Sequence, residues 1–222
     1  MTAAAEGWLG AVWPVVQGFL PRPPARVVEI GCGSLGGFVP MLSSSGYDAS
    51  GVDPNAPEGA SYRRVEFENA EPFADVDALV ASTSLHHVTD PADVLDRVIR
   101  ALGPGGRIVV IEWDREAFDQ PTAEWAFARL GSEPGWLHRL RDGWSESGKR
   151  WSDYLETWAD EEGIHAGETL VRLLDERFAR EHLARGPYLF PDLVGTTEED
   201  ELAAIKSEAI RATRIDYSGT LR

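Results

Sequence analysis

The stretch that most constrains the fold is a short apolar run followed by a glycine-rich turn, VVEIGCGSLGG, at residues 27–37. Apolar and β-branched residues ending at Ile30 predict a short buried strand, and the glycines after it predict a tight turn that opens a helix. Glycine is needed where φ is positive or where the backbone approaches a bulky ligand. Asp53 ends the next apolar run, at the position where a carboxylate in such units binds ribose hydroxyls. The two features predict a nucleoside site at the carboxyl ends of adjacent parallel strands.

The glycine pattern alone fits two classes of nucleoside-binding enzyme. Gly31, Gly33 and Gly36 also satisfy G-x-G-x-x-G, the pattern of dinucleotide-binding folds. An NAD(P)-dependent oxidoreductase of Rossmann type is therefore one alternative. The chain has only two lysines, Lys149 and Lys206, and neither has a tyrosine four residues earlier. The Tyr-x-x-x-Lys pair expected of such an oxidoreductase is therefore absent, which counts against this alternative.

Apolar runs that alternate with turns along the chain predict an α/β fold. The expected strands are residues 26–30, 48–52, 63–67, 77–82, 107–112, 186–190 and 212–221. The expected helices are residues 6–20, 34–45, 91–102, 121–130, 152–161, 168–185 and 197–210. Residues 54–62 are too short and too rich in proline and glycine for a full crossover helix, so we expect a compressed connection there. The helix at 6–20 should pack across the site mouth or the sheet edge, with a flap over the ligand as the alternative.

A second motif follows the fourth expected strand. Leu85-His86-His87-Val88 precedes Asp90-Pro91, which opens a helix, and the turn Leu102-Gly103-Pro104-Gly105-Gly106 leads into an apolar strand. Together with Glu29 and the glycine turn, this run resembles the class I S-adenosylmethionine-dependent methyltransferases of the Leu-His-His small-molecule type, which include enzymes of the ubiquinone and menaquinone pathways. The resemblance is specific over residues 26–112 and rests on topology alone over residues 186–221.

The resemblance implies a Rossmann-like three-layer α/β sandwich. Its seven-stranded sheet would be mostly parallel with a reversed last strand, and a helical cap would be added. We expect a single domain with an N-terminal helix at 1–25, a cofactor-binding core at 26–112, a cap at 113–185 and a strand-helix-strand at 186–222. Six of the eight tryptophans fall in the expected cap. They would either line a pocket for a planar or hydrophobic substrate or only fill the core of the cap.

The resemblance also implies which residues bind the cofactor. The cofactor would be S-adenosyl-L-methionine, with S-adenosyl-L-homocysteine as product, and its ribose would face Asp53. The full implied set is Glu29, Gly31, Cys32, Gly33, Asp53, Pro54, Glu68, Asn69, Ser82, Thr83 and His86. Glu68 or Asn69 would bind the adenine amino group, although a solvated charged turn fits the same sequence equally well.

Methyl transfer to an alcohol, phenol or protonated amine requires a base with a pKa near the working pH, which histidine provides. We expect His87 to be the general base and His86 to belong to the cofactor pocket, with the reverse assignment and a purely structural role for both left open. Substrate contacts are expected from Trp113, Asp114, Trp125 and His138. We expect O- or N-methylation ahead of C-methylation, and a protein that binds the cofactor without methylating remains an alternative.

The composition argues against several kinds of partner. A formal net charge of -16 opposes binding to a phosphate backbone, so we expect a small-molecule substrate and no nucleic acid. No apolar run approaches the length of a membrane span, so no membrane partner is expected. The single cysteine, Cys32, and the adjacent histidines do not have metal-ligand spacing, so no metal is expected. The first residues lack the basic segment of a signal peptide, which favours a cytoplasmic protein, either monomer or homodimer.

Overall fold

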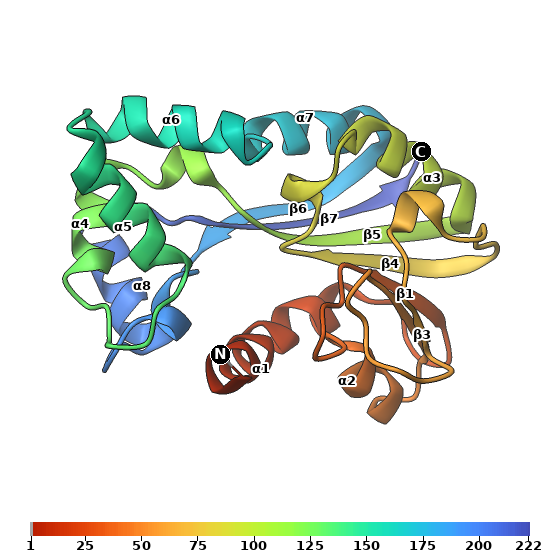
Figure 1. The fold of residues 1–222 in the computed structure, drawn as a ribbon. Coiled ribbons are helices and arrows are strands. Elements are labelled where there is room, and N and C mark those ends of the chain that lie inside the picture. The colour runs from red at the N-terminus through yellow and green to blue at the C-terminus, as the bar shows by residue number, and fades with distance from the viewer. Residues whose placement is uncertain (1) are drawn as a thin grey trace.

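Seven strands form one sheet in the order β3-β2-β1-β4-β5-β7-β6 (Figure 1). The structure is a computed structural model that describes residues 2–222, with side chains described from residue 7 onward, so Met1 of the expected N-terminal segment lies outside the described residues. The strands are β1 Arg26–Ile30, β2 Asp48–Val52, β3 Tyr62–Arg63, β4 Val76–Ser82, β5 Leu102–Trp113, β6 Phe178–Gly186 and β7 Arg214–Leu221.

The pairing of the strands confirms the expected sheet. Strand β1 lies parallel to β2, with Ile30 opposite Val52, and parallel to β4, with Ile30 opposite Ala81. Strand β7 is antiparallel to both β5 and β6, so the last strand is the reversed one. Because β1, β2 and β4 all end at the same edge, residues that follow them meet there.

Helices cover both faces of the sheet. The helices are α1 Thr2–Phe19, α2 Val39–Ser44, α3 Pro91–Ala101, α4 Gln120–Phe127, α5 Trp136–Ser147, α6 Trp151–Glu161, α7 Gly167–Arg177 and α8 Glu198–Lys206. Helices α1 and α2 lie on one face, and α3 and α7 lie on the other (Figure 1). Within residues 2–222, no helix combines the length and the apolar character that a bilayer crossing requires.

Alternation along the strands explains why both faces are apolar. In β1, Val27 packs with α1 and α2, whereas its neighbour Val28 packs with α3 and α7. Side chains that follow one another in a strand point to opposite faces, so a strand buried on both sides is apolar at most of its positions. The same holds for Val109 and Val110 of β5, which divide between the two cores.

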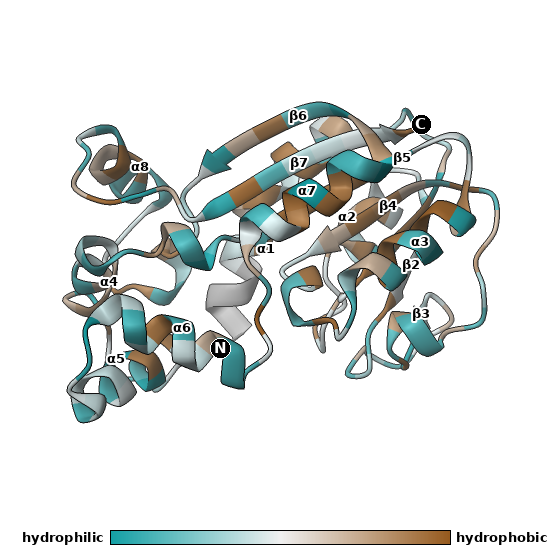
Figure 2. Ribbon diagram, turned by 90° about the horizontal axis from the view of Figure 1, so that it is seen from above, coloured by the Kyte–Doolittle hydropathy of each residue, from teal (hydrophilic) through white to brown (hydrophobic). Residues whose placement is uncertain are grey.

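A cap of three helices extends beyond one end of the sheet. Figure 2 shows α4, α5 and α6 gathered there, while α3 and α7 lie over the strands. The cap has its own core, in which Trp113, Phe118, Leu137 and Trp151 are buried. Short 3₁₀ turns complete the fold, namely η1 Phe67–Asn69, η2 Leu85–His87, η3 Arg115–Ala117 and η4 Phe190–Asp192.

Two expected elements near the glycine turn are shorter than predicted. Helix α2 begins at Val39 instead of residue 34, because Gly36 and Gly37 have φ values of +84° and +56°, which no α-helix contains. The strand expected at 63–67 is reduced to Tyr62–Arg63, and the chain turns into η1 soon afterwards. The connection at 54–62 contains no helix, as predicted.

The boundary of the cap also differs from the prediction. The helix expected at 168–185 ends at Arg177, and residues 178–186 form β6, so the strand predicted at 186–190 was placed eight residues too late. Helix α7 packs its Leu170 and Leu174 on the sheet core instead of the cap core, so the sequence that forms the cap ends before α7. Helix α5 was not predicted.

Candidate functional site

The glycine turn after β1 has the backbone conformation that its sequence predicts. Gly31 and Gly33 have φ values of +77° and +63°, in the region that favours glycine. The N–H of Gly31 donates to the carbonyl oxygen of Val52 at 2.8 Å. A Cβ at position 31 would lie 2.2 Å from the Cβ of Ser84, so a side chain there would displace the loop after β4. The turn therefore leaves bare backbone at the carboxyl edge of the sheet.

Asp53 connects the second strand to this turn. Its Oδ2 accepts a hydrogen bond from the N–H of Gly33 at 3.0 Å, and its Oδ1 accepts one from the N–H of Asn55 at 2.6 Å. A carboxylate oxygen can accept more than one hydrogen bond. Both oxygens can therefore still accept hydrogen bonds from ligand hydroxyls.

The buried side chain of Glu29 contacts the end of the glycine turn. Its side chain is 1% exposed, and its Oε2 accepts a hydrogen bond from the N–H of Phe38 at 2.7 Å, just before α2. Burial raises the pKa of Glu29 to about 8. The carboxyl group lies against Gly37, where any Cβ would approach it to 2.3 Å. Glu29 therefore fixes the end of the turn as well as bordering a cavity.

Two cavities meet at the carboxyl ends of β1 and β4. The first, of about 410 Å³, we call the α1 cavity; it is lined by Trp8, Leu9, Glu29, Gly31, Cys32, Gly33, Ser34, Leu35, Gly37, Ser82, Thr83, Tyr188, Pro191 and Asp192. The second, of about 270 Å³, we call the Asp53 cavity; it is lined by Ile30, Gly31, Val52, Asp53, Pro54, Glu66, Phe67, Glu68, Thr83, Ser84, His87, Val88 and Thr89. Gly31 and Thr83 line both, so the two cavities adjoin at these residues.

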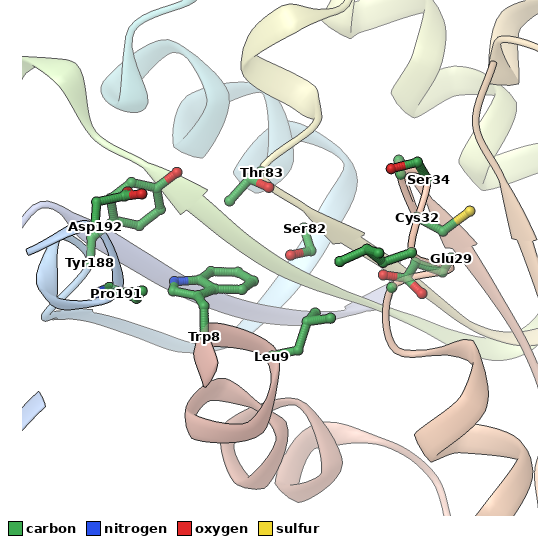
Figure 3. Close-up of a pocket in the computed structure, with 14 residues that line it drawn as sticks. Trp8, Leu9, Glu29, Cys32, Ser34, Ser82, Thr83, Tyr188, Pro191 and Asp192 are labelled. Carbon is green, nitrogen blue, oxygen red and sulfur yellow. The ribbon is translucent and has the colours of Figure 1, made fainter. Parts of the chain in front are cut away.

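Figure 3 shows how the walls of the α1 cavity are built. Trp8 and Leu9 rise from α1 on one side, and Tyr188 lies beyond them with Asp192. Cys32 and Glu29 lie at the opposite end, on the glycine turn and β1. The cavity is thus enclosed by segments from the beginning, the middle and the end of the chain.

A buried carboxylate holds the wall that carries Tyr188. Glu201, on α8, is fully buried and accepts hydrogen bonds from the N–H groups of Tyr188, Leu189 and Phe190 at 2.8, 2.9 and 2.7 Å. Three consecutive N–H groups converge on this one side chain. Such charge-assisted bonds are stronger than neutral ones, so they hold the segment leading into η4 rigidly against α8.

The two histidines of the Leu-His-His motif have different surroundings. His86 is buried, and its Nδ1–H donates to Oε2 of Glu112, whose Oε1 accepts from the N–H groups of Ser84 and Leu85. Glu112 therefore organises the turn after β4, in which Thr83 has a φ of +48°.

His87 lines the Asp53 cavity, and its side chain is exposed to solvent. The face of its ring against His86, with centroids 4.1 Å apart, is shielded from water. Desolvation, followed by the repulsive effect of His86, lowers the pKa of His87 to about 4. The ring is therefore neutral at physiological pH.

Most of the residues predicted to bind the cofactor lie at these cavities. Those lining the α1 cavity are Glu29, Gly31, Cys32, Gly33, Ser82 and Thr83, and those lining the Asp53 cavity are Gly31, Asp53, Pro54, Glu68 and Thr83. Two predicted residues lie elsewhere. His86 is bound to Glu112 behind the wall, and Asn69 is exposed and donates to Glu66 at 2.8 Å.

The four residues predicted to contact the substrate line neither cavity, because each is held by other parts of the cap or sheet. Trp113 is 3% exposed in the aromatic core, and Asp114 is buried in an ion pair with Arg185. The ring of Trp125 lies under the guanidinium group of Arg129, 4.2 Å from its centroid.

His138 is held in the same way by the loop before α5. Its Nδ1 accepts from the N–H of Gly135 at 3.2 Å, and its Nε2 bonds with the carbonyl oxygen of Gly131 at 2.9 Å. Both ring nitrogens are therefore occupied by backbone groups.

Residues that sequence reasoning did not assign form much of the α1 cavity. The segment at 186–190 was interpreted as a strand, which concealed the position of three residues in or just after it. These residues, Tyr188, Pro191 and Asp192, line the α1 cavity. Trp8 could have been predicted to line the cavity, because it lies in the N-terminal helical pattern for which a flap over the ligand was an alternative. Its neighbour Leu9 lies on the same wall.

Known proteins resemble this chain in sequence and in fold. A family model described as a methyltransferase domain matches residues 13–157, more than half of the chain. Two ubiquinone biosynthesis O-methyltransferases, from Bradyrhizobium sp. and Xylella fastidiosa, are each 30% identical over 54% and 55% of the chain. The aligned regions cover 51% and 56% of those two relatives, so the chain spans about half the length of each.

The fold agrees with this match. A crystal structure of an S-adenosylmethionine-dependent methyltransferase from Mesorhizobium loti superimposes with a TM-score of 0.58 at 21% identity, covering 95% of this chain and 97% of that one. The glycine turn, Asp53 and the reversed last strand are thus set in a shared architecture. The chain belongs to the methyltransferase-domain family and has the fold of the class I S-adenosylmethionine-dependent methyltransferases.

Proposed function

We propose that this chain is an S-adenosylmethionine-dependent methyltransferase that acts on a small aromatic or hydrophobic molecule, at oxygen or nitrogen in preference to carbon. The observation that carries the proposal is the meeting of two cavities at Gly31 and Thr83. The Asp53 cavity offers a carboxylate suited to a ribose, and the α1 cavity joins the glycine turn to an aromatic and apolar wall where a second molecule can lie. A transferase that joins two ligands requires this arrangement.

The residues of the Asp53 cavity fit the nucleoside part of the cofactor. The oxygens of Asp53 can accept hydrogen bonds from two ribose hydroxyls, and Glu68 at the same cavity can accept one from the adenine amino group. Gly33 leaves room for the methionine part, because no heavy atom lies within 4 Å of a Cβ built on it. The bound cofactor supplies a methyl group on a sulfonium, which is already activated for displacement.

The chain's own contribution would be alignment and exclusion of water. Trp8, Leu9 and Tyr188 enclose the α1 cavity beside the glycine turn. An acceptor held there would be ordered before reaction, and ordering of this kind is the main source of rate in a two-substrate displacement. The names of the two O-methyltransferase relatives support oxygen as the acceptor atom.

His87 fits a binding role better than the role of general base. It lines the Asp53 cavity and not the α1 cavity. With a pKa of about 4, it is also a weak proton acceptor at neutral pH. We therefore infer that His87 packs against the nucleoside, and that the proton released when a hydroxyl or amine is methylated passes to water and not to His87.

Two titrations and one turnover assay test the proposal. Calorimetry should show binding of S-adenosylhomocysteine and no binding of NADH; the opposite result would favour an oxidoreductase. Transfer of a labelled methyl group to members of a panel of phenols and amines should then be detectable. Cofactor binding without any transfer across the panel would instead support a protein that binds the cofactor without methylating.

A further inference from the structure

One residue where the two cavities meet has a strained backbone. Thr83, the residue after β4, lines both the α1 cavity and the Asp53 cavity, and its φ is +48°. Figure 3 shows its side chain on the wall of the α1 cavity. A β-branched residue rarely adopts a positive φ, whereas glycine does so without a steric penalty. Strain of this kind collects at binding and catalytic sites, and it persists only where the surrounding structure imposes it.

The end of β5 holds the chain on one side of Thr83. The N–H of Thr83 donates to the carbonyl oxygen of Ile111 at 2.7 Å. The next residue of β5, Glu112, is 1% exposed. Its Oε1 accepts hydrogen bonds from the N–H groups of Ser84 and Leu85 at 2.9 and 2.6 Å. The backbone and one side chain of β5 therefore bind three consecutive N–H groups of the turn.

The end of β1 holds the same turn from the other side. The hydroxyl of Ser84 donates to the carbonyl oxygen of Ile30 at 3.1 Å. Ser84 also lies close against the glycine turn, because a Cβ built on Gly31 would be 2.2 Å from the Cβ of Ser84. Ser84 is thus fixed between β1 and β5. Thr83 has to turn the chain from the end of β4 to this fixed point.

Glu112 lines neither of the two cavities. Its Oε2 accepts a hydrogen bond from Nδ1–H of His86, so both of its oxygens are bonded to the turn after β4. Hydrogen bonds to a carboxylate are about twice as strong as neutral ones. A side chain that binds this turn three times without facing a cavity can influence a ligand only through the turn.

We propose that Glu112 is a positioning residue that holds Thr83 in its strained conformation, so that the junction of the two cavities has its final shape before a ligand binds. This inference rests on the proposed function, because it takes the cofactor to extend past Thr83 from one cavity into the other. In the unbound chain the hydrogen bonds to Glu112 offset the strain at Thr83. Without them the turn would relax, and the cofactor would have to restore its shape on binding.

Glu112→Gln is the first test, because it removes the charge and keeps an oxygen for the two backbone N–H groups. His86 can adopt its other neutral tautomer and accept from the new amide. We expect the variant to fold, as judged by urea unfolding, and to bind S-adenosylhomocysteine about fivefold to tenfold more weakly in calorimetry. The matched control is Asp77→Asn, since exposed Asp77 accepts from the N–H of Arg26 at the opposite end of β4. It should change the affinity by less than about twofold.

A double-mutant cycle separates positioning of Thr83 from general support of the fold. Thr83→Gly removes the steric penalty of the positive φ, so in that background Glu112→Gln should change the affinity by less than about twofold. Thr83→Ala also lacks the hydroxyl group but keeps a Cβ, so the penalty and the effect of Glu112→Gln should both remain. Each comparison is made within one background, which removes the contribution of the hydroxyl group itself.

The strain can also be measured without altering Glu112. Thr83→Gly should unfold at a higher urea concentration than Thr83→Ala, because glycine relieves the strain that alanine retains. At an ordinary helix or strand position the order would be reversed. This comparison decides the matter even if Glu112→Gln does not fold, since a lower midpoint for Thr83→Gly would overturn the inference.

Two results of the calorimetry would also overturn it. The first is an unchanged affinity for S-adenosylhomocysteine in a folded Glu112→Gln variant. The second is an equal fold-change in the Thr83→Gly background and in the unaltered one, because Glu112 would then act by a route other than Thr83. In both cases binding of S-adenosylhomocysteine by the unaltered chain leaves the proposed function standing. Absence of binding by the unaltered chain would remove the proposed function and this inference together.

Discussion

The carboxylate of Asp53 accepts a hydrogen bond from the backbone N–H of Gly33 at 3.0 Å, which ties the end of β2 to the turn that follows β1. The same carboxylate also accepts from Asn55. One side chain therefore shapes the glycine turn and presents oxygens to the Asp53 cavity.

Replacement of Asp53 tests this double role. Asp53→Ala should weaken binding of S-adenosylhomocysteine by about 1.5 to 3 kcal/mol, the range for the loss of charge-assisted hydrogen bonds. Isothermal titration calorimetry measures this directly. Asp48→Ala, at the exposed beginning of the same strand, serves as the control. An unchanged affinity in the Asp53 variant would exclude the ribose contact.

His87 offers a choice between a binding role and a catalytic one. Because it lines the cavity assigned to the nucleoside, His87→Ala should reduce the affinity for S-adenosylhomocysteine, by about 1 kcal/mol for the loss of packing. Asn69→Ala, on the neighbouring exposed turn, should leave affinity unchanged. A general base would give another result, namely unchanged affinity with turnover lowered about 100-fold or more.

The parts of the fold that could be predicted are those that local sequence determines. Strands β1 and β2 were placed correctly because apolar runs end there at glycine or aspartate. The prediction for the residues of β6 was wrong. Their sequence, FAREHLARG, contains helix-favouring and charged residues, and only pairing with β7 makes this segment a strand. Helix α5 was hidden by Gly143, where the hydroxyl of Tyr154 leaves no space for a side chain.

The candidate site also has parts that local sequence determines and parts that depend on long-range contacts. Most of the residues predicted to bind the cofactor follow strands, so their positions beside Gly31 and Asp53 could be predicted. The wall formed by Tyr188 and Asp192 depends on where the chain returns after β6, and on the contact between Glu201 and three backbone N–H groups. No local pattern in the sequence reports such a long-range contact. The sequence left open whether the tryptophans of the cap line a pocket or fill its core, because both kinds of ring have the same sequence signature.

Glu201 should support the stability of the protein as well as the shape of the α1 cavity. Glu201→Ala would leave three N–H groups without their carboxylate, including that of the fully buried Leu189, and should lower the free energy of unfolding by about 2 to 4 kcal/mol. Urea unfolding provides the measurement. Glu199→Ala, exposed on the same helix, should change it by less than about 0.5 kcal/mol. Equal effects of the two substitutions would contradict the proposed support.

Glu29 should make stability depend on pH in a direction opposite to that of most acidic residues. Its pKa is 4.5 for the free group and about 8 in the folded chain, so between these values the folded state binds a proton that the unfolded state has lost. Stability is therefore lost as the pH rises through the folded value, by about 1 kcal/mol between pH 7 and 8.5. The lowered pKa of His87, about 4, has the opposite effect on stability, but only below the ordinary histidine pKa, so it does not contribute between pH 7 and 8.5.

Urea unfolding at the two pH values should show this loss of stability in the unaltered chain. The loss should be absent in Glu29→Gln, whose side-chain oxygen can still accept a hydrogen bond from the N–H of Phe38. A loss of the same size in the variant would mean that another group is responsible.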